Sequence, residues 1–149
     1  MNTKLTTIIL LAVLFTGAVA SQTANEGLST SLEATFINSD PVPLQSGEDG
    51  DLTFKIINNG DVEAEDVQVQ LLDNYPFEVK PDRKRNYSLG TLNQGQEYQI
   101  STEVQVAEDA PDGSNNFRAK ITNGEFTRTV NIPVEVQSEN IDLNVANLN

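Results

Sequence analysis

The 149-residue sequence contains no cysteine, no histidine and no tryptophan, and each absence removes a class of chemistry. Without cysteine the chain has neither disulfides nor a thiol that could carry a lipid, so we expect its fold to depend on an apolar core alone. Without histidine it lacks the commonest general base and the imidazole ligands of metal sites. Without tryptophan it lacks the indole ring that often stacks against sugars.

Basic residues are also scarce, because 9 lysines and arginines stand against 22 aspartates and glutamates, a formal net charge of −13. Such a surface repels nucleic acids and anionic lipids, so we expect neither as a partner. Strong acidity is also typical of the surface proteins of salt-loving organisms, although many exported proteins are simply acidic.

The first twenty residues have the pattern of a secretory signal peptide. Lys4 is followed by an uncharged, mostly apolar run over residues 5–20, which ends in Ala18-Val19-Ala20. Small residues at these positions predict cleavage between Ala20 and Ser21. The alternative is an uncleaved anchor, but the run is shorter than the ~20 residues that a spanning helix needs. We therefore expect an extracellular or cell-surface protein with no stable membrane insertion after cleavage.

The remainder of the chain is dominated by alternation of apolar and polar residues, which is typical of strands with one buried face. A linker over 21–29 would lead into one domain over 30–137. The strands that we expect cover residues 31–38, 50–58, 64–72, 76–79 (the weakest pattern), 86–90 and 96–107, followed by a hairpin over 117–136.

Turn residues separate these strands, and one turn allows a register to be predicted. Asn123-Gly124 is a strong two-residue hairpin signal, so Thr122 would pair with Glu125. Ile121 would then face Phe126, and Phe117 would face Val130, which brings apolar residues together. The same register puts Ala119 opposite Arg128, where the small alanine would leave room for the arginine stem.

Antiparallel strands with frequent turns predict an all-β fold, an immunoglobulin-like β-sandwich of about seven strands. A jelly roll is the other sandwich considered, but it would need more strands. The cysteine and tryptophan signature of antibody domains is absent from the sequence.

The turn motifs also occur in a distinctive order along residues 40–137. They are Ser46-Gly47-Glu48 before a strand, Asn59-Gly60-Asp61 after it, Leu89-Gly90-Thr91-Leu92 with Gly95-Gln96 before the long strand over 98–106, and Ala110-Pro111-Asp112-Gly113 after that strand. This order resembles the CARDB / NEW3 / archaeal S-layer-related group of immunoglobulin-like modules. Ser46 and Gln94 stand where that group usually has prolines. The motifs form turns, so they indicate a fold more strongly than a function.

The resemblance implies an extracellular and often repeated spacer or adhesion module, with no catalytic residues to carry over. We therefore expect a non-catalytic structural or adhesion module of a surface-layer or multi-repeat envelope protein. Its partners would be other cell-surface proteins or further repeats of the same chain. The alternative is a carbohydrate-binding accessory module of a secreted glycoside-active protein, in which the segment 75–87 would contact a glycan through Tyr75, Phe77 or Tyr87. An enzyme is not expected.

Residues 138–149 form a tail that contains an echo of the first predicted strand. Apolar, acidic and polar residues follow the same order in 141–149 as in 32–40, at an offset of 109 residues. The tail is therefore interpreted as the first strand of a second repeat. The alternatives are a polar tail, an extra strand of the first domain, or a strand that pairs with the sheet edge of a neighbour.

Three further groups of residues are candidate sites. Asn86 begins the sequon Asn86-Tyr87-Ser88 and is a candidate for glycosylation in an exported protein. Two acidic groups are weak Ca²⁺ candidates if their loops lie at the same end of the sandwich, and ordinary solvated turn residues if they do not. These groups are Glu48, Asp49 and Asp51, and Glu108, Asp109 and Asp112. No other cofactor is expected.

Half of the basic residues that remain after cleavage lie within six positions, at Lys80, Arg83, Lys84 and Arg85. This cluster is interpreted either as an interaction loop for an acidic module or an anionic glycan, or as a solvated loop.

Overall fold

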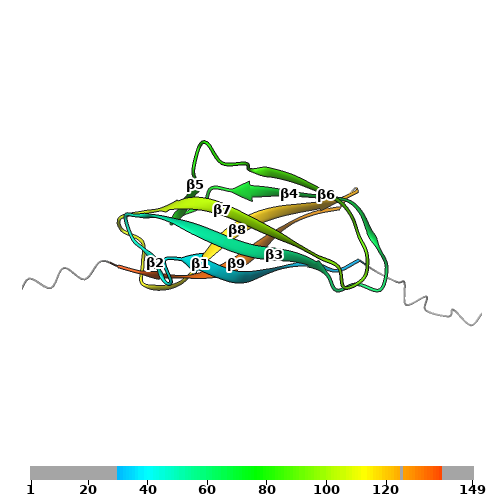
Figure 1. The fold of residues 1–149 in the computed structure, drawn as a ribbon, viewed down its shortest axis with the longest axis horizontal. Coiled ribbons are helices and arrows are strands. Elements are labelled where there is room, and N and C mark those ends of the chain that lie inside the picture. The colour runs from blue at the N-terminus through cyan, green and yellow to red at the C-terminus, as the bar shows by residue number, and fades with distance from the viewer. Residues whose placement is uncertain (1–29, 125, 139–149) are drawn as a thin grey trace, which may run out of the picture.

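The computed structural model describes residues 30–124 and 126–138. Within these ranges the chain forms two β-sheets that pack face to face (Figure 1). The strands are β1 (Leu32–Asp40), β2 (Leu44–Gln45), β3 (Asp49–Asn58), β4 (Ala64–Leu72), β5 (Phe77–Val79), β6 (Asn86–Leu92), β7 (Glu97–Val106), β8 (Gly113–Asn123) and β9 (Phe126–Gln137).

The first sheet has the order β1-β3-β7-β5 and the second has the order β2-β9-β8-β4-β6. All pairs are antiparallel except β2 with β9, where Leu44 lies opposite Val136. The orders β1-β3-β7-β5 and β9-β8-β4 correspond to the two sheets of an immunoglobulin domain. The predicted immunoglobulin-like sandwich is thus confirmed. The weakly patterned segment 76–79 contains β5, whereas the two-residue strand β2 was not predicted.

The core lies between the sheets because each long strand turns alternate residues inward. Phe54 on β3, Phe77 on β5 and Phe117 on β8 are almost completely buried. The ring centroid of Phe117 lies 6.1 Å from that of Phe54 and 6.1 Å from that of Phe77. Since Phe117 belongs to one sheet and its two neighbours to the other, these rings join both sheets in a single core.

The hairpin register predicted for β8 and β9 is wrong by two residues. Asn123, rather than Thr122, is the last paired residue of β8, and it lies opposite Phe126. The turn begins at Gly124, whose φ of 56° suits glycine. A shift of two residues leaves every side chain on its predicted face, so alternation alone could not distinguish the registers.

The correction changes the partners along the hairpin. Ala119 lies opposite Val130, and Phe117 lies opposite Ile132, so buried residues pair with buried residues. Arg128 lies opposite Ile121 instead of Ala119. Phe126 and Arg128 thus lie on the inward face of β9 but beyond the packed core, and both are exposed.

The chain enters the sandwich at one end and leaves it at the other (Figure 1, blue and orange-red ends). We call these the entry end and the exit end. The entry end comprises Thr30, loops 59–63 and 93–96, and the turn at Asn123 and Gly124. The exit end comprises segments 41–43, 46–48, 73–76 and 107–112, with Ser138.

Several predictions lie outside the described residues. These are the signal peptide over 1–20, its cleavage between Ala20 and Ser21, the linker 21–29 and the echo over 141–149. Within the described ranges, no helix has the length and apolar character that crossing a membrane requires.

Candidate functional site

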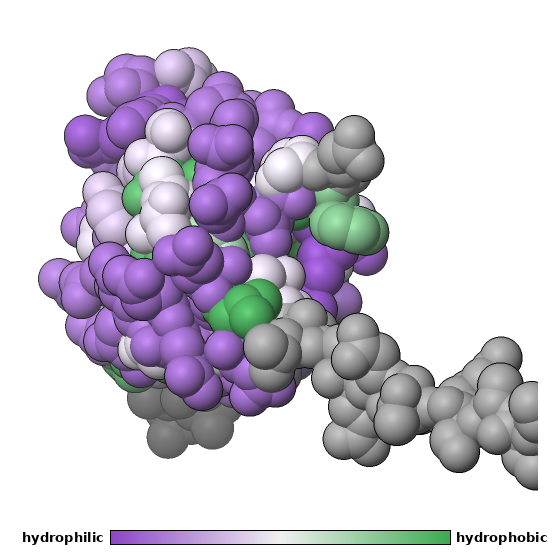
Figure 2. Space-filling model, turned by 90° about the vertical axis from the view of Figure 1, so that its right-hand side faces the viewer, coloured by the Kyte–Doolittle hydropathy of each residue, from purple (hydrophilic) through white to green (hydrophobic). Residues whose placement is uncertain are grey.

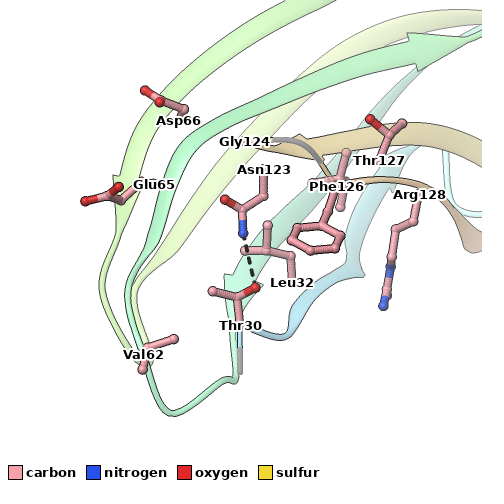
Figure 3. Close-up of a pocket in the computed structure, with 11 residues that line it drawn as sticks. Thr30, Leu32, Val62, Glu65, Asp66, Asn123, Gly124, Phe126, Thr127 and Arg128 are labelled. Atoms are coloured by element: carbon pink, nitrogen blue, oxygen red, sulfur yellow. Dashed lines mark hydrogen bonds between the residues drawn. The ribbon is translucent and has the colours of Figure 1, made fainter. Parts of the chain in front are cut away.

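A cavity of about 780 Å³ opens at the entry end (Figure 3). Its apolar wall consists of Leu32, Val62, Ile121 and Phe126, which come from β1, the loop after β3, β8 and β9. The wall therefore combines residues from both sheets, at the point where the sandwich is open.

The cavity lies where the inward face of the β8–β9 hairpin passes from buried to exposed residues. Ile121 is still part of the core, but Phe126, farther along the same inward face, is 81% exposed. Figure 2 views this end directly, and hydrophobic side chains form small patches there among hydrophilic ones. An exposed phenylalanine beside an apolar wall marks a surface that can bury an apolar group.

Charged residues lie at the rim of the cavity. Asp66 has a φ of 51°, and the pairing of β4 with β6 shifts between Ala64 and Val67. This bulge places Glu65 and Asp66 at the rim, where Figure 3 shows their carboxylates pointing outward. Arg128 lies beside Phe126, and in the described part of the chain no carboxylate is within ion-pair distance of its guanidinium.

Asn58 fixes the shape of the entry end. Its side chain is completely buried, and Nδ2 donates hydrogen bonds to the carbonyl oxygens of Val62 at 2.7 Å and Leu92 at 2.9 Å. Its Oδ1 accepts a hydrogen bond from the amide of Gly60 at 3.0 Å. Because Val62 belongs to the cavity wall, this one side chain holds the wall in place.

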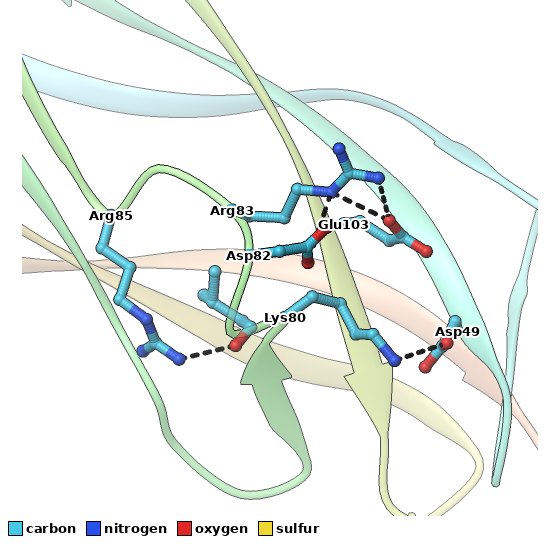
Figure 4. A network of polar contacts seen from close by, with 7 residues as sticks. Asp49, Lys80, Asp82, Arg83, Arg85 and Glu103 are labelled. Atoms are coloured by element: carbon cyan, nitrogen blue, oxygen red, sulfur yellow. Dashed lines mark hydrogen bonds and ion pairs between the residues drawn. The ribbon is translucent and has the colours of Figure 1, made fainter.

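The basic cluster lies in the loop between β5 and β6, and ion pairs fasten it to the neighbouring strands (Figure 4). Lys80 Nζ lies 2.7 Å from Asp49 Oδ2, and this hydrogen bond raises the pKa of Lys80. Arg83 Nε donates a hydrogen bond to Glu103 Oε2 at 2.9 Å, and this bond raises the pKa of Arg83 above its ordinary value.

The other two basic side chains are also engaged. Arg85 Nη1 lies 2.6 Å from Asp73 Oδ2, and its Nη2 donates to the carbonyl of Val79 at 2.6 Å. Lys84 Nζ lies 4.7 Å from the ring centroid of Tyr87, a cation–π contact. The predicted interaction loop is thus held by charges within its own domain, and its docking role stays a prediction.

The two acidic loops considered for Ca²⁺ do lie together at the exit end. The amide of Gly47 donates to the carbonyl of Val106 at 3.1 Å, which brings the 46–48 turn beside Glu108. Asp49 is paired with Lys80, while Asp112 accepts a hydrogen bond from the amide of Ser138. That bond lowers the pKa of Asp112. Among the described residues, no three acidic side chains converge closely enough to hold a metal ion.

Asn86 is the first residue of β6, an outer strand of its sheet, and its side chain is exposed. An exposed asparagine at a sheet edge is accessible to a glycosyltransferase, and its glycosylation stays a prediction.

The aromatic residues near the basic loop differ in exposure. Phe77 is a core residue, and burial raises the pKa of the half-buried Tyr87. Tyr75 is 62% exposed, and its hydroxyl donates to the carbonyl of Asp109 at 2.6 Å. Desolvation, together with Asp109, raises the pKa of Tyr75. Of the three, Tyr75 alone presents an exposed ring.

Sequence reasoning did not find the entry-end cavity. Phe126 was expected to be a core residue opposite Ile121, and Arg128 was expected to lie along Ala119. Both expectations followed from the wrong hairpin register. No short motif marks Val62, whose carbonyl accepts a hydrogen bond from Asn58.

No protein-family model and no curated protein matches the sequence. Several solved structures are similar to this structure in fold. The CARDB domain of PF1109 from Pyrococcus furiosus, determined by NMR, is 12% identical with a TM-score of 0.45, over 74% of this chain and 97% of that one. A crystal structure of that domain in complex with di-metal ions is 11% identical, with a TM-score of 0.41 over 72% of this chain and 89% of that one.

BslA, described as a bacterial hydrophobin, is 12% identical with a TM-score of 0.45, over 75% of this chain and 97% of that one. The similarity to CARDB modules that the turn motifs predicted is thus also found among solved structures.

Proposed function

We propose that this chain is a non-catalytic structural or adhesion module of an exported cell-surface protein and acts there as a stiff spacer. The observation that carries the proposal is the path of the chain, which enters at Thr30 and leaves at Ser138 at opposite ends (Figure 1). Strands β3 and β7 have ten residues each, and ten residues span about 33 Å. Each module therefore separates its flanking segments by roughly that length.

Stiffness follows from the packing. The Phe54, Phe117 and Phe77 rings tie the two sheets together. The ion pairs of Lys80 and Arg83 hold the β5–β6 loop against the sheet. A spacer of this kind would act with other surface proteins or with further repeats of its own chain. Its acidic surface disfavours nucleic acids as partners.

Export is tested by producing the full chain in a secreting host and sequencing the N-terminus of the mature protein. We expect the mature protein in the envelope or medium, beginning at Ser21. The control variant Ala18→Arg breaks the cleavage pattern and should keep the first twenty residues. Cytoplasmic wild-type protein that retains Met1 would contradict the proposal.

The spacer role is tested by a distance measurement between spin labels, which the cysteine-free chain makes straightforward. Labels at Thr30→Cys and Ser138→Cys should give one narrow distribution at about 35 Å or more, given the strand length. A matched control pairs Thr30→Cys with Asn123→Cys, since these two side chains are hydrogen-bonded at 3.1 Å. A broad distribution for the first pair and a narrow one for the control would contradict a stiff spacer.

A second candidate function, carbohydrate binding, is favoured by the exit end. Exposed Tyr75 lines a groove of about 410 Å³ together with Asn74, Glu78 and Glu108. An exposed ring beside amide and carboxylate groups is suited to stacking on a sugar. Glycan-array binding that is lost in Tyr75→Ala would support this function, and no binding by the wild-type protein would oppose it.

A further inference from the structure

The two ends of the module carry different apolar features. At the exit end, Val42 is 69% exposed and Tyr75 is 62% exposed. At the entry end, the exposed Phe126 and the buried Leu32 flank the 780 Å³ cavity. One end thus presents projecting apolar side chains, and the opposite end presents an opening with an apolar wall.

One charge at the entry end is complementary to the exit end, although Glu65 and Asp66 also lie at the rim of the cavity, with carboxylates that point outward. Arg128 lines the cavity and has no carboxylate within ion-pair distance among the described residues. The exit end carries Glu108 and Asp109 directly beside Tyr75, whose hydroxyl contacts the carbonyl of Asp109. If the Tyr75 ring of one copy entered the entry-end cavity of another copy, the carboxylates of Glu108 and Asp109 would lie near Arg128 of that second copy.

The sequence specifies how close a following copy would lie. β9 ends at Gln137, and the echo of β1 places Ile141 where Leu32 stands in the first copy. Only residues 138–140 separate these positions, and the four Cα steps from Gln137 to Ile141 span at most about 14 Å. Such a short connection brings the exit end of one copy against the entry end of the next.

We propose that successive copies of this module pack end to end, with Tyr75 and Val42 of one copy covering the entry-end cavity of the following copy beside Phe126. Arg128 of the following copy then faces the loop at Glu108 and Asp109. The contact joins different surfaces that lie at opposite ends of the module, so it repeats along a line. This inference rests on the proposed spacer function and specifies the joint between spacers.

The test uses a two-copy chain in which residues 30–140 are followed directly by residues 32–138. Each copy contains a complete core, because all the buried core residues lie between Leu32 and Val136. The first copy carries Tyr75→Cys, the second carries Phe126→Cys, and the chain has no other cysteine. The control carries Ile37→Cys in the first copy, since Ile37 is 44% exposed on β1, away from both ends.

Under mild oxidation we expect the Tyr75–Phe126 pair to form a disulfide at least about tenfold faster than the control pair, because disulfides require Cα atoms within about 7 Å. Adding Arg128→Glu to the second copy should slow the reaction. Equal rates for the two pairs would overturn the proposal.

The other candidate for the cavity is the segment that precedes Thr30 in the same chain. A single-copy chain of residues 21–149 with Leu28→Cys and Phe126→Cys tests it. Faster oxidation in this chain than in the two-copy chain would mean that the chain's own segment covers the cavity, and it would overturn the end-to-end joint. If the joint fails, the spacer function can still hold, with flexible connections between copies. The two failures are distinguishable because the spacer function is tested separately, by export and by the Thr30–Ser138 distance.

Discussion

Replacing Asn58 by alanine should strongly destabilise the protein. Nδ2 of Asn58 satisfies the carbonyls of Val62 and Leu92, and Oδ1 satisfies the amide of Gly60. Asn58 is completely buried and Gly60 is also buried. Alanine would leave these three backbone groups without their partner, at a place where the loop after β3 crosses the end of the core.

The expected loss follows from the cost of unpaired buried groups, about 1–3 kcal/mol each. Three such groups, partly relieved by water at this open end, give a loss of about 4 kcal/mol. A domain of this size is stable by about 5–15 kcal/mol. With an m value of about 1.5 kcal/mol per molar urea, the unfolding midpoint should fall by between about 2 and 3 M.

The matched control is the next residue along the chain. Asn59 is exposed, and its Nδ2 donates to Glu33 Oε2 at 2.9 Å on the surface. Asn59→Ala should therefore change the free energy of unfolding by no more than about 0.5 kcal/mol. Asn58→Asp keeps the size and the acceptor but loses the donor when ionised, so it should behave like Asn58→Ala at neutral pH. Equal urea midpoints for the Asn58→Ala and Asn59→Ala variants would refute the reasoning.

Three other predictions concern single residues. Phe117→Ala removes a buried ring with two aromatic neighbours, so it should lose about 4 kcal/mol in urea unfolding, and a loss below about 1 kcal/mol would contradict the shared core. The hydrogen bond from the Ser138 amide lowers the pKa of Asp112 below its ordinary value of 3.8. This bond therefore stabilises the folded state fully above the ordinary pKa, and the stabilisation is lost as the pH falls through the lowered pKa. Acid unfolding of Asp112→Asn should accordingly be less steep than that of the wild type, and identical curves would argue against this hydrogen bond. In a glycosylating host, Asn86→Gln should abolish any mass increment of the secreted protein, whereas an increment that persists would place the glycan elsewhere.

The sequence was sufficient for the long strands because burial on one face imposes a period of two. Residues 64–72 were predicted with the bounds that β4 has, and the segment 96–107 differs from β7 by one residue at each end. The strand β2 has only two residues, so it has no periodicity, and it exists through its pairing with the end of β9. The hairpin register failed for a related reason, since two registers that differ by two residues put the same side chains inward.

The candidate sites show that a sequence pattern does not reveal which side chains will contact one another in the fold. The cluster of Lys80, Arg83, Lys84 and Arg85 was visible as charge, but its acidic partners lie elsewhere, at Asp49 on β3, Glu103 on β7 and Asp73 just after β4. Positions that are distant in sequence become ion pairs only once the strands and loops are packed, so the sequence did not show these partners. The cavity was missed because its wall combines residues from β1, β8, β9 and the loop after β3, which only the packing of the two sheets brings together.

The distribution of charge supports end-to-end contact over lateral contact. Lys55, Lys80 and Arg83 pair with carboxylates along the sheet that contains β3 and β7, which reduces the net charge of that face. The acidic residues at the exit end have fewer basic neighbours, since Glu48, Glu108 and Asp109 have no ion pair within the described ranges. A bare acidic end would repel a second acidic end. In the proposed joint, Phe126 supplies an apolar contact and Arg128 a cation, which together offset part of this repulsion, while Glu65 and Asp66 point away from the cavity. The exposed inward face of β9 at Phe126 and Arg128 is thus the feature on which the proposed joint depends.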